Sequence, residues 1–128
     1  HDMIVLDAMI CNTDRHFGNF GFLVDNMTNE IAAPAPLFDH GNALFNYAGR
    51  DDLESEAAFS SYVDTLLPCV YDDFIGTAKK VLTIRHREGL RRLLNFKFKK
   101  HPRYNLPRGR LALIERQVQK RAGMLLEK

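Results

Sequence analysis

The 128-residue chain has only two cysteines, Cys11 and Cys69, and they lie far apart. Without a Cys-x-x-Cys pair, neither a disulfide scaffold nor a zinc knuckle is expected, and both thiols are interpreted as buried apolar side chains. No uncharged apolar run approaches the roughly 20 residues that a membrane span needs, so no membrane partner is expected. The first residues also lack the basic and apolar regions of a secretion signal. These absences favour a protein of the reducing cytoplasm.

The remaining composition is that of one globular domain. Hydrophobic residues make up 45% of the chain, which is enough to build a core, and the length suits a single unit over residues 1–128. The net charge of +2 is unevenly distributed, because residues 1–75 hold 13 acidic and 2 basic side chains whereas residues 76–128 hold 3 and 16. An acidic half suits divalent cations, and a basic half suits phosphates or an acidic partner. Alternatively, the two halves attract each other within one fold.

Hydrophobic periodicity predicts an α+β fold that is mainly helical. Short alternating runs on either side of the turn at 25–29 indicate a β-hairpin, and longer runs with spacings of three and four indicate helices. Polar residues over 49–56 indicate a loop. The four phenylalanines near the hairpin are interpreted as its core, namely Phe17, Phe20, Phe22 and Phe38. The expected elements are a helix over 2–11, where so short a run is also compatible with a strand, strands over 20–24 and 30–33, and helices over 71–81, 84–99 and 106–127.

One polar segment contains the candidate catalytic and metal-binding residues. It has the pattern Asp-Arg-His-x-x-Asn, in which Asp14 and Asn19 are five residues apart, and Asp39 follows in Phe-Asp-His-Gly. Phosphoryl transfer needs an oriented nucleophile and a divalent metal that bridges phosphate oxygens. Asp14 can accept the proton of an attacking hydroxyl, while Asn19 and Asp39 offer the hard oxygen ligands that Mg²⁺ prefers. A hairpin between Asn19 and Asp39 would return the chain beside its start. The spacing of Asp14 and Asn19 also matches the catalytic loop of protein kinases.

These motifs resemble the C-terminal part of HipA-like serine/threonine kinases and, more distantly, phosphoinositide kinases. The resemblance covers about residues 2–45 and rests on two segments, Asn12 to Gly21 and Pro36 to Asn42. It implies a kinase C-lobe-like helical bundle with the hairpin at the active site, ATP and Mg²⁺ as cofactors, and a protein hydroxyl as the acceptor. It also implies that Asp14 is catalytic, that His16 lies near the transferred phosphoryl group, and that Asn19 and Asp39 bind the metal and nucleotide. Arg15 is expected to brace the loop through a carboxylate.

The chain departs from that family in lacking a glycine-rich phosphate loop and any lysine before Lys79. It is therefore expected to be a C-terminal lobe that is incomplete without an N-terminal nucleotide-binding lobe. A separate N-terminal lobe or an antitoxin-like protein is a possible partner.

Two other functions stay open. A metal-dependent phosphohydrolase would gather polar groups around a metal, namely His1, Asp2, His16, Asp39 and His40. A non-catalytic interaction module would use the basic C-terminal half to hold an acidic partner. Direct nucleic-acid binding is not expected, because the basic stretch from Arg85 to Arg110 contains no readable recognition motif.

Overall fold

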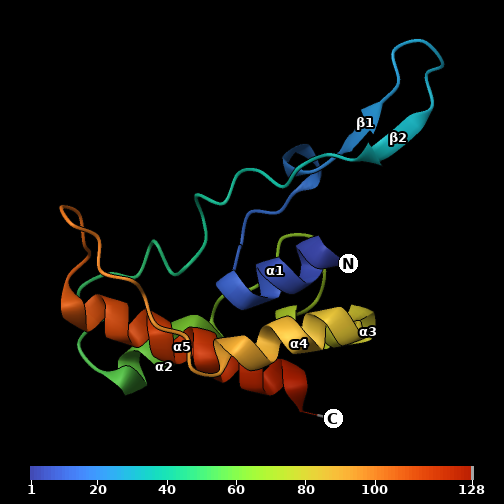
Figure 1. The fold of residues 1–128 in the computed structure, drawn as a ribbon. Coiled ribbons are helices and arrows are strands. Elements are labelled where there is room, and N and C mark those ends of the chain that lie inside the picture. Colours follow the sequence, from blue (N-terminus) through green and yellow to red (C-terminus); the bar gives the residue numbers. More distant parts are fainter. Residues whose placement is uncertain (128) are drawn as a thin grey trace.

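The computed structural model describes residues 1–127 and confirms an α+β, mainly helical fold with one antiparallel hairpin. Figure 1 shows a cluster of helices with the hairpin extending away from it on two long connecting segments. No helix in the described part of the chain is long and apolar enough to cross a membrane. The elements are α1 (Asp2–Ile10), the 3₁₀ turn η1 (Phe17–Asn19), β1 (Phe22–Val24), β2 (Ile31–Pro34), α2 (Glu56–Asp64), α3 (Phe74–Val81), α4 (Ile84–Leu93) and α5 (Arg108–Leu126).

The longest helix, α5, organises the core. It contacts α1, α2, α3 and α4, and it buries apolar side chains along its length because they recur at helical spacing. From α2, Phe59 is almost fully buried and stacks edge-on against Phe45, with ring centroids 5.2 Å apart. The core therefore sits between α5 and the shorter helices. Its buried apolar residues include Val5, Ala8, Met9, Phe74, Ala78, Leu90, Ile114, Val118, Ala122 and Leu125.

The hairpin adds little to this core. Phe22 pairs with Pro34 and Leu23 with Ala33, and the register is irregular before Val24 meets Ile31. All three residues of β1 are exposed. The interpretation of the nearby phenylalanines as core is wrong for three of them, since Phe17, Phe22 and Phe38 are 80%, 58% and 46% exposed. A two-stranded sheet has no second layer of its own to cover such side chains.

Several helices differ from expectation, and α3 begins at Phe74 rather than at residue 71, because Asp73 caps it. The sequence analysis missed α2, although Ser55 caps it by accepting a hydrogen bond from the Ala58 amide at 3.0 Å. The helix expected over 84–99 ends at Leu93, because the chain then turns back towards α5 and Gln119 donates to the Phe96 carbonyl at 2.9 Å. The last helix begins at Arg108 rather than at 106, directly after a proline that donates no backbone hydrogen bond.

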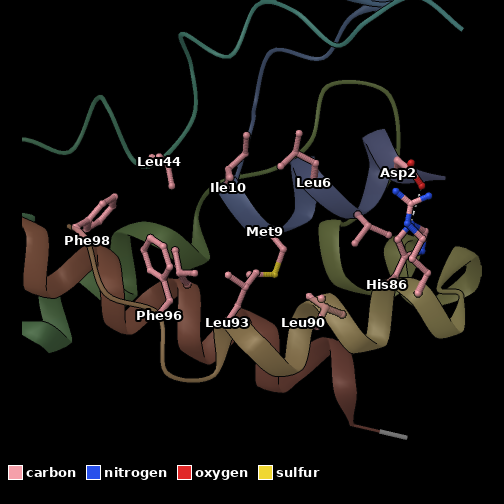
Figure 2. A pocket seen from close by; sticks show the side chains of 14 residues that line it. Asp2, Leu6, Met9, Ile10, Leu44, His86, Leu90, Leu93, Phe96 and Phe98 are labelled. Atoms are coloured by element: carbon pink, nitrogen blue, oxygen red, sulfur yellow. Dashed lines mark hydrogen bonds and ion pairs between the residues drawn. The ribbon is translucent and has the colours of Figure 1, made fainter.

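An apolar pocket of about 450 Å³ lies between α1 and α4. Figure 2 shows Met9 of α1 and Leu90 and Leu93 of α4 along it, with Phe96 at one end. At the other end, His86 lies 2.8 Å from a carboxylate oxygen of Asp2 and completes a capping box with the first turn of α4. The pocket therefore follows the seam between two helices that are far apart in sequence.

The two cysteines have different surroundings. Cys11 is buried, as expected, and burial raises the pKa of its thiol to about 11. Cys69 is exposed, so its interpretation as a buried side chain is wrong. It lies between α2 and α3, where the chain runs over the surface without regular structure.

Candidate active site

The end of α1 shapes the first part of the site. Cys11 adopts a left-handed backbone conformation with φ 49°, which ends the helix and turns the chain outward. Asn12 is fully buried, and its side-chain amide donates to a carboxylate oxygen of Asp7 at 3.1 Å. Its own side-chain oxygen accepts from the Asp14 amide at 3.2 Å, as in an Asx-turn. Asp14 therefore begins a loop whose direction is fixed by buried polar groups.

Arg15 joins three segments of the chain. Its guanidinium is fully buried and contacts the Asp7 carboxylate through two nitrogens, at 2.9 and 3.1 Å. The remaining nitrogen, Nη1, donates to the carbonyl oxygens of Asn19 at 2.6 Å and Phe38 at 2.7 Å. Arg15 does brace the loop through a carboxylate, and it also holds the residue before Asp39 beside Asn19. A guanidinium suits this position because its planar donors can satisfy several acceptors at once.

A second connection links Asp14 to the segment after Asp39. The Asn42 side-chain amide donates to Asp14 Oδ2 at 3.0 Å, and the Thr13 amide donates to the Asn42 carbonyl at 3.3 Å. The Asn42 side-chain oxygen in turn accepts from the Tyr47 hydroxyl at 2.7 Å. These contacts leave Asp14 Oδ1 without a protein hydrogen bond among residues 1–127. That oxygen is the one available to a hydroxyl group.

Asn19 and His16 are held by short local contacts. The Asn19 side-chain nitrogen donates to the Asp14 carbonyl at 2.8 Å, which leaves its amide oxygen as the free acceptor of a mostly buried side chain. His16 is exposed, and its Nδ1 accepts from the Gly18 amide at 3.0 Å. Because Nδ1 accepts, the neutral imidazole carries its proton on Nε2. His16 therefore presents a hydrogen-bond donor to solvent.

Asp39 is exposed and adopts a left-handed conformation with φ 54°. Such a conformation is uncommon for residues other than glycine and often marks a functional site. Arg15 fixes the carbonyl just before Asp39, while the Asp39 carboxylate itself makes no hydrogen bond or ion pair within the described residues. It is thus an unpaired anion on a fixed backbone. Arg15 thus holds the residue before Asp39 near the Asn19 backbone, and Asn42, three residues after Asp39, contacts Asp14.

The sequence analysis missed three residues that hold this site together, namely Asp7, Asn12 and Asn42. For Asp7 a signal was present, because it is the single charged residue inside an otherwise apolar helical run, eight positions before an arginine. A buried carboxylate requires a paired cation, so the run itself indicated a partner. Asn12 and Asn42 lie within the two segments that carry the resemblance, but their residue type alone assigned them no role, since asparagine is common in loops.

The metal cluster of the phosphohydrolase alternative is not assembled. Asp2 is hydrogen-bonded to His86 on the opposite helix. Within residues 1–127, no three histidine, cysteine or carboxylate side chains lie close enough together to hold a metal ion. The Asp39 carboxylate and the Asn19 amide oxygen, the two predicted ligands, have no hydrogen-bond donor among residues 1–127. Two such oxygens suit Mg²⁺ when substrate phosphates and water supply the rest.

Comparison with known proteins gives a partial similarity to a kinase. The chain is 38% identical over 71 residues to the serine/threonine-protein kinase CtkA of Helicobacter pylori (strain J99 / ATCC 700824), a match that covers 56% of this chain and 21% of the relative. The chain thus spans about a fifth of that kinase's length. No family model and no solved structure matches the chain. The partial similarity supports a kinase-like transferase.

Proposed function

We propose that this chain is the catalytic lobe of a HipA-like kinase that transfers a phosphoryl group from ATP to a serine or threonine hydroxyl of a protein. The observation that carries the proposal is the buried Arg15, which joins the Asn19 and Phe38 carbonyls at 2.6 and 2.7 Å. It fixes the loop with Asp14 and Asn19 beside the segment with Asp39. The partial similarity to a serine/threonine kinase supports the same conclusion.

In this proposal Asp14 orients the acceptor hydroxyl. Its Oδ2 is held by the Asn42 amide at 3.0 Å, so Oδ1 accepts the hydroxyl proton. His16 donates from Nε2 to an oxygen of the phosphoryl group, because the Gly18 amide occupies Nδ1. Both side chains belong to one short loop, so their relative position is set before any substrate binds.

Asn19 and Asp39 hold the metal in this proposal. Asn19 contributes its free amide oxygen, and Asp39 contributes a carboxylate that no cation in the described residues neutralises. Mg²⁺ bound with ATP would neutralise charge on the phosphates. Arg15 holds the backbone just before Asp39, so less ordering of this segment is needed when the metal binds.

The apolar side chains around the site support a second lobe as partner. Phe17, Phe38 and the residues of β1 are exposed next to the loops that hold Asn19 and Asp39. Exposed apolar groups in such number indicate an interaction surface. In the proposal an N-terminal nucleotide-binding lobe covers them and completes the ATP site in the cytoplasm.

Calorimetric titration with Mg²⁺ and ATP tests the site. The wild-type chain and Asp39→Asn are compared, because this substitution removes one charge while keeping the side-chain size. Binding of Mg²⁺ with ATP should fall at least about tenfold in Asp39→Asn, since a charged ligand to the metal is lost. Asp51→Asn is the matched control, because Asp51 is an exposed carboxylate outside the site.

Equal affinity in the wild type and Asp39→Asn would contradict the proposed metal site. Equal losses in Asp39→Asn and Asp51→Asn would show that only the overall charge matters. If the wild-type chain binds no Mg²⁺ with ATP, the isolated chain is not a nucleotide site. The interaction module would then be the better description of it.

A further inference from the structure

The phosphoryl-transfer site leaves the basic half of the chain unexplained. Most of its cations have no acidic partner in the other half. Only four ion pairs form within residues 1–127, and of these one involves a histidine and one the fully buried Arg15. Attraction between the two halves therefore accounts for few of the basic side chains. Several unpaired cations surround one depression of the surface.

That place is a groove of about 720 Å³ between the segment 97–106 and the first turns of α5. Lys99, Lys100 and Arg108 line it, and none of the three has an acidic partner within the described residues. The carboxylate in the groove, Glu115, is already engaged by Lys97 at 2.8 Å and by the Phe98 amide at 2.9 Å. The groove therefore carries a net positive charge.

Apolar side chains also line the groove. Phe98, Leu106 and Leu111 contribute to it, and Leu106 is 52% exposed. The segment is held in place, because Phe96 and Phe98 pack edge to face with ring centroids 4.9 Å apart and Gln119 anchors the Phe96 carbonyl. A concave surface that combines apolar side chains with unpaired cations matches a ligand that has both apolar and acidic groups.

We infer that this groove binds an acidic peptide segment of a partner protein, one in which leucine-like side chains alternate with aspartate or glutamate. The apolar side chains of the peptide cover Leu106 and Leu111, while its carboxylates meet Lys99, Lys100 and Arg108. The site is distinct from the Asp14 loop, so it stands whether or not the chain transfers phosphate.

A peptide fits better than a nucleic acid for two reasons. Glu115 occupies Lys97 and the Phe98 amide, so the cations left for a ligand are confined to Lys99, Lys100 and Arg108, whereas a nucleic acid carries a charge at every nucleotide. A peptide can place neutral residues opposite Glu115. Sequence-tolerant nucleic-acid binding also relies on open aromatic stacking platforms, whereas Phe98 is engaged by Phe96.

Fluorescence anisotropy of the full 128-residue chain tests this inference with a fluorescein-labelled peptide of alternating glutamate and leucine. The wild type should bind it, and binding should weaken as salt is added. Lys99→Glu with Lys100→Glu should lower the affinity at least about tenfold. Arg91→Glu with Arg92→Glu is the control, since it makes the same charge change at an adjacent exposed pair on α4, and it should lower the affinity less than about threefold.

A second variant tests whether the apolar side chains of the groove contribute to binding in addition to its charge. Leu106→Ser keeps every charge and should weaken peptide binding several-fold, whereas Leu67→Ser, at a similarly exposed leucine elsewhere, should not. Equal effects of the two charge-reversal pairs, or no effect of Leu106→Ser, would overturn the inference. So would a wild type that does not bind the peptide, or one that binds an oligothymidylate of equal charge more tightly. Circular dichroism confirms that each variant is folded.

Discussion

The helical body and the hairpin region of this protein are stabilised by different interactions. The body buries apolar side chains around α5, and Phe59 is only 1% exposed there. The hairpin and the chain from Thr13 to Asn42 bury few apolar groups and are joined to the body mainly by polar contacts, whereas the segment that follows returns to the core at Phe45. Arg15 holds the Asn19 and Phe38 carbonyls, and Arg110 of α5 donates to the carbonyls of Phe45 and Asn46 at 3.0 and 3.1 Å. The candidate site is therefore held in place by buried polar contacts more than by packing in the apolar core.

The largest effect is expected from Arg15→Met. It leaves Asp7 as an unpaired buried charge, which costs about 3–5 kcal/mol of the free energy of unfolding. It also frees the segments that contain Asn19 and Asp39, so binding of Mg²⁺ with ATP should be lost. Urea denaturation followed by circular dichroism measures the first effect, and calorimetry measures the second.

The double variant Asp7→Leu with Arg15→Met provides the control. Because neither buried charge remains, it should be more stable than Arg15→Met alone. Binding should nevertheless stay absent, since the Asn19 and Phe38 carbonyls still lack their donor. A loss below about 1 kcal/mol in Arg15→Met would contradict the central role of this guanidinium.

A pair of phenylalanine substitutions tests the contrast between the core and the hairpin directly. Phe59→Ala removes a fully buried ring and should cost about 3–5 kcal/mol. Phe22→Ala removes a ring that is 58% exposed on β1 and should change the stability by about 0.5 kcal/mol or less. Comparable losses in urea denaturation would mean that the hairpin is packed against the body in solution.

The smallest effect is expected from two glycines. Gly89 lies within α4 and lines the apolar pocket, and an added Cβ there meets no atom within 4 Å. Gly89→Ala should therefore raise the stability by about 0.5–1 kcal/mol through helix propensity. Gly21→Ala, equally free of contacts beside the hairpin, should leave the unfolding midpoint nearly unchanged. A large gain at Gly21 would indicate that the hairpin unfolds together with the body.

The local structure could largely be predicted from the sequence. Alternation of apolar residues located the hairpin, and spacings of three and four located four of the five helices, because both patterns reflect backbone geometry alone. The helix α2 was not predicted, although Ser55 caps it, because a short helix of mixed polarity gives a weak periodic pattern. Helix ends that depend on a distant residue, such as the contact of Gln119 with Phe96, could not be predicted from local patterns.

The sequence by itself determined which chemical groups the candidate site contains and the order in which they follow. It also determined the helix and hairpin segments that carry them, because propensity and periodicity act over a few residues. Only the tertiary structure decided that Asp7 is the partner of Arg15, and that this arginine also reaches Phe38, 23 residues away. It also decided that three of the four phenylalanines near the hairpin are exposed. Burial depends on what packs over a side chain, and that cannot be read from the identity of its neighbours along the chain.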